Sequence, residues 1–74
     1  MERIIVSEVV WEGDALQGSW HTQLDGHPVE LWFDGVWRWK VGDQHGVLRE
    51  CDPTRAGTIR AMATLIRRWA SQEL

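Results

Sequence analysis

The chain of 74 residues has only one cysteine, Cys51, and no long apolar stretch. A single cysteine cannot form an internal disulfide, and no second thiol is present for a thiolate zinc site. A membrane-spanning helix needs about 18 or more consecutive apolar residues, and the chain has no such run. Its first residues lack the basic segment and the small-residue cleavage site of a signal peptide. We therefore expect a protein of the reducing cytoplasm that does not cross a membrane.

Positive charge is scarce in the first half of the chain. Residues 1–34 hold one basic and seven acidic side chains, a net charge of −6, whereas residues 35–74 hold seven basic and four acidic ones, a net charge of +3. The whole chain carries −3. Attraction to phosphate dominates affinity for duplex nucleic acid, so an acidic chain is a poor general binder of it. An acidic surface is suited instead to a basic partner.

Turn signals divide the first 51 residues into short runs rich in β-branched and aromatic residues. Two Asp-Gly pairs, at residues 25–26 and 34–35, separate such runs, and this dipeptide is a strong signal for a two-residue hairpin turn. Beyond residue 51 the apolar period becomes helical, with Asp52 as the expected N-cap and Pro53 as the first helical residue. We predict a single α+β domain over residues 1–74, an antiparallel four- to five-stranded β-meander with one C-terminal α-helix packed on one face. The expected strands are 3–11, 16–24, 29–33, 36–41 and 47–51, the expected helix is 53–71, and its apolar stripe is Ile59, Met62, Leu65, Ile66 and Trp69.

Tryptophan is unusually abundant, with six residues in 74. If both Asp-Gly pairs form two-residue loops, Trp32 pairs with Trp37 and Glu30 with Trp39 across the second hairpin, and His21 pairs with Glu30 across the first. Trp32, Trp37 and Trp39 then share one sheet face, and the helix covers the other, mostly aliphatic face.

An exposed apolar patch usually marks an interaction site, and tryptophan is enriched among interface anchors. Alternatively, the sheet curls and these rings fill the core, because a one-residue slip in register moves every side chain to the opposite face. The expected partner-binding residues are Trp32, Trp37, Trp39, Glu30, His21, Asp25 and Asp34.

The sequence predicts no catalytic group, metal site or cofactor. His21 and His27 point to opposite faces in this register and His45 lies in a turn, so three metal ligands do not converge. No turn places a histidine beside Cys51 to activate its thiol. The glycines are single turn residues and do not form a phosphate-binding loop. We therefore do not expect an enzyme.

These features favour a small non-catalytic protein-binding domain. A homodimer through the tryptophan face is one form of this hypothesis, since it would bury the second apolar surface. In size, charge and lack of a catalytic site, the chain resembles the small inhibitors made by phages and mobile elements, among them anti-CRISPR proteins. This class-level resemblance implies a protein partner, such as a nucleic-acid-binding complex of a host.

Direct nucleic-acid binding is the alternative function. Residues 36–40 alternate aromatic and basic side chains, and a sheet can stack unpaired bases on such rings. Alternation along the strand, however, places Arg38 and Lys40 on the face opposite Trp37 and Trp39. A single-stranded nucleic-acid-binding protein is therefore less favoured than a protein-binding domain.

Overall fold

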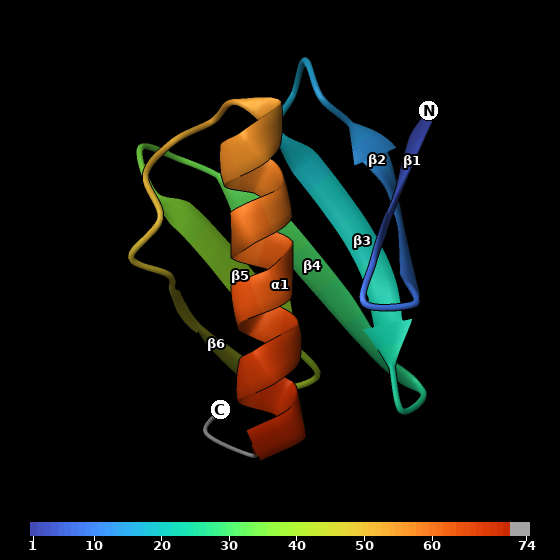
Figure 1. Cartoon of the computed structure of the whole chain (residues 1–74). Coiled ribbons are helices and arrows are strands. Elements are labelled where there is room, and N and C mark those ends of the chain that lie inside the picture. Colours follow the sequence, from blue (N-terminus) through green and yellow to red (C-terminus); the bar gives the residue numbers. More distant parts are fainter. Residues whose placement is uncertain (72–74) are drawn as a thin grey trace.

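The protein is described by a computed structural model that covers residues 1–71. Six antiparallel strands lie side by side in chain order, and one helix follows them (Figure 1). The predicted α+β meander with a C-terminal helix is confirmed, although the strands number six instead of four or five. Residues 72–74 of the expected domain lie outside the described residues. The elements are β1 (Glu2–Val6), β2 (Val9–Asp14), β3 (Ser19–Leu24), β4 (His27–Phe33), β5 (Trp37–Val41), β6 (Gln44–Val47) and α1 (Arg55–Ser71).

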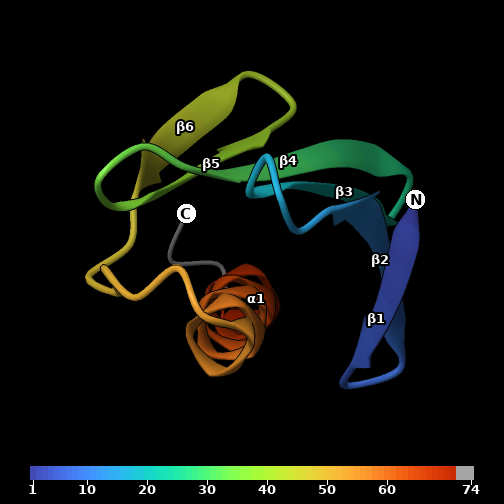
Figure 2. The same cartoon turned by 90° about the horizontal axis from the view of Figure 1, so that it is seen from above.

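The sheet curls around the helix, so that α1 lies against its concave side (Figure 2). As predicted, α1 covers the face that carries Trp20, Leu24 and Leu31. Full burial of a large apolar side chain contributes about 1.5–3 kcal/mol, so this layer between sheet and helix is the main source of stability. The core residues are Ile4, Val6, Trp11, Trp20, Leu24, Val29, Leu31, Trp37, Trp39, Val41, Leu48, Ala61, Met62 and Leu65.

The sixth strand arises because the expected strand 3–11 is a hairpin. Ser7 and Glu8 form its turn, with φ angles of 49° and 68°, and Val6 pairs with Val9. Such left-handed conformations cost non-glycine residues about 1–2 kcal/mol each. The turn places Val6 and Trp11 on the same side of the sheet, toward the core. A straight strand would have put these two residues on opposite faces.

The turn between β4 and β5 has three residues, and the predicted register of this hairpin is wrong. Phe33 pairs with Trp37 and Leu31 with Trp39, one residue away from the expected partners. This slip turns every side chain of β5 to the opposite face. Trp37 and Trp39 therefore lie in the core, with 0% and 5% of their surfaces exposed, and not on the uncovered face. Curling of the sheet with burial of these rings, the alternative interpretation, is correct for both.

The two Asp-Gly pairs adopt different backbones. Asp25 and Gly26 both have positive φ, 51° and 79°, as a type I′ turn requires, and Leu24 pairs with His27 as predicted. In the second pair only Gly35 has positive φ, at 77°. The same dipeptide therefore gives a two-residue loop once and a three-residue loop once.

Two core tryptophans lie across glycines of the neighbouring strand. Gly13 pairs with Trp20, and Gly46 pairs with Trp39. A Cβ atom at Gly46 would approach Trp39 Cζ2 to 2.8 Å, so the indole occupies the space that a side chain would need. Glycine weakens a strand, and packing of an aromatic ring over it restores buried contacts.

The helix begins two residues later than predicted. Thr54 is its N-cap, because Thr54 Oγ1 accepts a hydrogen bond from the N–H of Gly57 at 3.2 Å. Asp52 supports the cap instead of forming it, since its Oδ1 accepts from the Thr54 N–H at 3.0 Å. Pro53 consequently precedes the helix. Within residues 1–71, no helix has the length and apolar character needed to cross a membrane.

Other boundaries and one stripe residue also differ from prediction. Residues 16–18 precede β3, and β6 covers 44–47 in place of 47–51, because a two-residue turn at 42–43 follows β5. On the helix, Met62 and Leu65 are buried as expected, whereas Ile59 is 37% exposed and Ala61 is buried. The contact surface of α1 is thus rotated toward its small residues.

Candidate functional site on the open face of the sheet

The convex side of the sheet, turned away from α1, is termed the open face. The β3–β4 hairpin has the predicted register, with His21 opposite Glu30 and Ser19 opposite Trp32. Alternation along both strands turns these four side chains to the open face. His21, Glu30 and Ser19 are exposed, and Trp32 is half-buried. The open face therefore presents one large aromatic ring among polar side chains.

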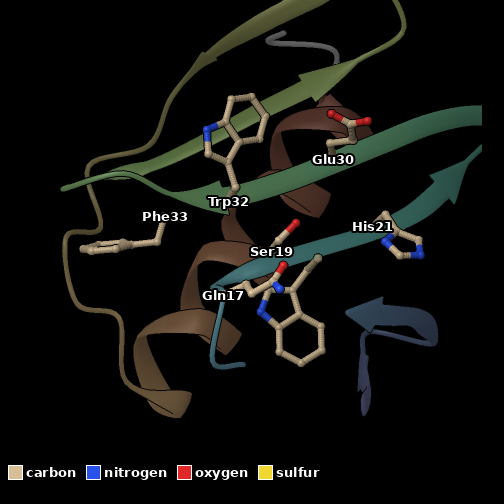
Figure 3. Close-up of a pocket in the computed structure, with 7 residues that line it drawn as sticks. Gln17, Ser19, His21, Glu30, Trp32 and Phe33 are labelled. Carbon is tan, nitrogen blue, oxygen red and sulfur yellow. The ribbon is translucent and has the colours of Figure 1, made fainter. Parts of the chain in front are cut away.

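A shallow hollow lies beside Trp32 on this face. Its volume is about 470 Å³. Figure 3 shows Trp32 and Glu30 projecting from β4, with Ser19 and His21 on the adjacent β3. The hollow lies here because the small side chain of Ser19 stands directly across from the large ring of Trp32. This Trp32 hollow is lined by Gln17, Ser19, Trp20, His21, Glu30, Trp32 and Phe33.

A second hollow, of about 500 Å³, continues from the first toward β2. His21 and Glu30 line both hollows, so together they form one shallow trough across β2, β3 and β4. Val10 lines the far end of this trough and pairs with Ile5 of β1. These two apolar side chains are 45% and 69% exposed. The trough thus runs between an aromatic ring at one end and an aliphatic pair at the other.

Basic side chains of β5 border the trough. The register that buries Trp37 and Trp39 brings Arg38 opposite Trp32 and Lys40 opposite Glu30. Arg38 Nε lies 3.4 Å from a carboxylate oxygen of Asp34, which partly neutralises it. The open face therefore carries charges of both signs around its apolar groups.

The structure brings together some of the predicted partner-binding residues and separates others. His21, Glu30 and Trp32 line the Trp32 hollow, and Asp34 pairs with Arg38 at its β5 side. Asp25 lies at the tip of the β3–β4 hairpin, where its Oδ2 accepts a hydrogen bond from Trp69 Nε1 at 2.6 Å. The ring of His27 packs edge-on against the same indole at 5.4 Å. Asp25 thereby holds the last turns of α1 to the sheet.

The indole N–H of buried Trp37 has a specific hydrogen-bond partner. Its Nε1–H donates to the backbone carbonyl oxygen of Asp52 at 2.9 Å. The indole nitrogens of Trp11, Trp20 and Trp39 are buried without a hydrogen-bond partner within residues 1–71. Trp37 is thus the core tryptophan that connects the sheet to the start of the helix.

Below the cap, three charged side chains form a compact network. Arg60 Nε donates to Glu50 Oε2 at 2.7 Å, and another guanidinium nitrogen of Arg60 lies 3.2 Å from Asp52 Oδ2. The hydrogen bond from Arg60 lowers the pKa of Glu50 below its ordinary value. Hydrogen bonds from the backbone and hydroxyl of Thr54 lower the pKa of Asp52. This network stabilises the segment that leads into α1.

The potential metal ligands and the one thiol of the described residues lie apart from one another. No group of three or more His, Cys, Asp and Glu side chains in residues 1–71 is arranged to hold a metal ion. Cys51 is exposed, and its Sγ–H donates to the Arg49 carbonyl oxygen at 3.4 Å. His21 and Glu30 lie on the outer surface of the sheet and not in an enclosed cleft.

Sequence reasoning missed the aliphatic end of the trough. Ile5 and Val10 belong to what reads as one continuous β-branched strand, and only the Ser7-Glu8 turn makes them neighbours on the open face. The available signal was the polar pair Ser7 and Glu8 inside an otherwise apolar run.

Comparison with models of protein families, with curated proteins and with solved structures finds no match. The class that the fold and site define is therefore a small α+β domain with an uncovered sheet face.

Proposed function

We propose that this chain is a non-catalytic protein-binding domain whose partner docks on the trough of the open face. The observation that carries the proposal is the uncovered surface between half-buried Trp32 and the exposed Ile5–Val10 pair. Tryptophan is enriched among residues that anchor interfaces, and a hollow beside such a ring can receive an apolar side chain of the partner. Polar side chains around the trough supply the rim.

The finer form of the proposal is that the chain acts as an inhibitor of the kind made by phages and mobile elements, including anti-CRISPR proteins. It would then act by covering a functional surface of a host nucleic-acid-binding complex. The acidic excess of residues 1–34, which contain the whole of β1 to β4, supports a partner with a basic surface. A homodimer through the open face is a version in which the partner is a second copy.

Direct binding of single-stranded nucleic acid has less support. Its proposed platform comprised Trp32, Trp37 and Trp39, and two of these rings are in the core. One half-buried ring can stack one base, which contributes about 1–3 kcal/mol. That single contact would have to overcome a net charge of −3.

The proposal is tested by site-specific photo-crosslinking in the host cell. A photoreactive residue is placed at Ser19, inside the Trp32 hollow, and in a matched chain at Ala56, an exposed position on α1. We expect a discrete protein adduct from position 19 and none from position 56. Adducts that form equally from both positions, or from position 56 alone, would reject the open face. An adduct of twice the chain mass would assign a second copy as the partner, and an adduct with nucleic acid would favour the alternative.

A further inference from the structure

A separate hollow lies on the helix side of the molecule, between the segment after β6 and the C-terminal half of α1. Its volume is about 340 Å³, and buried Leu48 forms its apolar base. Thr64 and Arg68 line it from the helix, and Arg49 and Glu50 line it from the segment. This Arg49–Arg68 hollow shares no lining residue with the trough of the open face.

The positive charges of this region are unequally neutralised. Helix α1 contains four arginines and no acidic residue. Arg55 pairs with Glu2 at 3.4 Å, and Arg60 pairs with Glu50 at 2.7 Å and with Asp52 at 3.2 Å. Within residues 1–71, these ion pairs leave Arg49 and Arg68 without a carboxylate within 4.0 Å.

Glu50 lines the hollow, but both of its carboxylate oxygens accept hydrogen bonds from other groups. Its Oε2 accepts from Arg60 Nε, and its Oε1 accepts from the backbone N–H of Asp52 at 3.2 Å. Both oxygens therefore serve the network at the start of the helix. Within residues 1–71, Arg49 and Arg68 lack a carboxylate partner, and together with Arg60, Glu50 and Asp52 they give the surroundings of the hollow a net charge of +1.

Arg49 and Arg68 line one hollow with like charges, which repel each other, and Arg68 is half-buried, where screening by water is reduced. An oxyanion between them would remove this repulsion and accept charge-assisted hydrogen bonds from both. The hydroxyl group of Thr64 offers a further donor. We propose that the Arg49–Arg68 hollow binds a phosphate group.

The surroundings favour a single phosphate over a long polyanion. The carboxylates of Glu50 and Asp52 border the region, and the chain carries a net charge of −3. Both would repel successive phosphates of a nucleic-acid backbone. Inorganic phosphate and the phosphate ester of a nucleotide present the same chemistry to the two arginines. The site does not depend on the proposed function of the open face.

The test is a titration of the full chain with inorganic phosphate at constant ionic strength. Binding is monitored by the NMR chemical shifts of the backbone amides. We expect saturable shifts at residues 49, 64 and 68. Replacement of Arg68 or Arg49 by glutamine should weaken binding about tenfold or more, because a hydrogen bond to a charged group is lost. The matched control, Arg55→Gln, removes an arginine on the β1 side of the same helix and should change affinity less than about twofold.

Shifts that do not saturate, or that chloride reproduces at equal ionic strength, would overturn the proposal. Equal weakening by Arg55→Gln and Arg68→Gln would also overturn it, because it would show that only general charge attracts the anion. A nucleoside monophosphate distinguishes the two sources. Equal affinity for it supports recognition of the phosphate group alone, and at least tenfold tighter binding supports a nucleotide ester as the ligand.

Discussion

The Nε1–H group of Trp37 donates a hydrogen bond to the backbone carbonyl oxygen of Asp52 at 2.9 Å. This bond connects β5, the strand next to the β6 edge of the sheet, to the segment just before α1. The first turn of the helix also encloses the oxygen, since a Cβ atom at Gly57 would collide with it. The contact requires the β4–β5 register in which Trp37 turns inward. The β4–β5 register and the position of α1 on the sheet therefore stabilise each other.

Replacement of Trp37 by phenylalanine should destabilise the protein more than replacement of Trp39. Both changes remove similar volume from the core. Only Trp37→Phe also leaves the Asp52 carbonyl oxygen without its indole donor, which costs about 1–3 kcal/mol, whereas Trp39→Phe removes a buried N–H that has no acceptor within residues 1–71. Urea unfolding of both variants measures the difference. Equal losses would show that the bond contributes nothing.

The two hairpins that begin with Asp-Gly explain how far the sequence could predict this fold. At Asp25 the local turn preference and the burial of Trp20 agree, so the β3–β4 register follows from the sequence. At Asp34 they conflict. The Asp-Gly dipeptide favours a two-residue turn through local backbone conformation alone, while burying two indoles contributes several kcal/mol. Burial of Trp37 and Trp39 prevails, and turn chemistry alone could not reveal it.

Substitution of Gly46 by alanine should destabilise the protein by about 1–3 kcal/mol. The added methyl group would approach the ring of Trp39, to 2.8 Å from Cζ2, and a well-packed core relieves such overlap poorly. In a chain that already carries Trp39→Leu, the same substitution should cost less, because the ring is gone. A double-mutant cycle measured by thermal unfolding provides the coupling energy. Strict additivity would contradict the packing of Trp39 over Gly46.

Asp25 should prove structurally important. Asp25→Ala removes the acceptor for Trp69 Nε1 and places alanine at a φ of 51°, so we expect a loss of about 1–3 kcal/mol. Asp25→Asn retains an acceptor oxygen and a residue that tolerates this conformation, and should lose less than half as much. Hydrogen exchange of the last turns of α1 provides a local measurement. Equal destabilisation by both variants would argue against the hydrogen bond.

The free energy of unfolding should fall as the pH is lowered, because protonation weakens the network around Arg60. The pKa values of Glu50 and Asp52 lie below their ordinary values of 4.5 and 3.8, through bonds from Arg60 and Thr54 respectively. The unfolded chain therefore binds protons at higher pH than the folded one. Their stabilisation is complete above the ordinary values and disappears as the pH falls through the lowered ones.

This pH dependence is measured as the urea midpoint between neutral and acidic pH. Arg60→Gln should flatten the acidic decline, because Arg60 is the main cause of the lowered pKa of Glu50. Arg67→Gln serves as the control, since the Arg67 guanidinium donates to the Thr64 hydroxyl. The same decline in the Arg60→Gln variant as in the wild type would exclude the bonds of Arg60 as its cause.

The candidate site was only partly predictable for the same physical reason as the fold. His21, Glu30 and Trp32 reach the open face because the register of the first hairpin is set by its turn. The side chains of β5 depend on the second turn, so Arg38 replaces tryptophan as the neighbour of Trp32. Composition indicated an excess of tryptophan but could not show that Trp32 alone of the expected three reaches the open face.

The most direct test of partner binding by the open face uses the partner protein identified by crosslinking. Its Kd is measured for the wild-type chain and for the Ser19→Arg variant. Arginine at this exposed position fills the Trp32 hollow without disturbing the core. The account predicts a Kd at least about tenfold higher, an unchanged melting temperature, and a wild-type Kd for the helix-face control Ile59→Ala. An unchanged Kd for Ser19→Arg, with both variants folded, would contradict it.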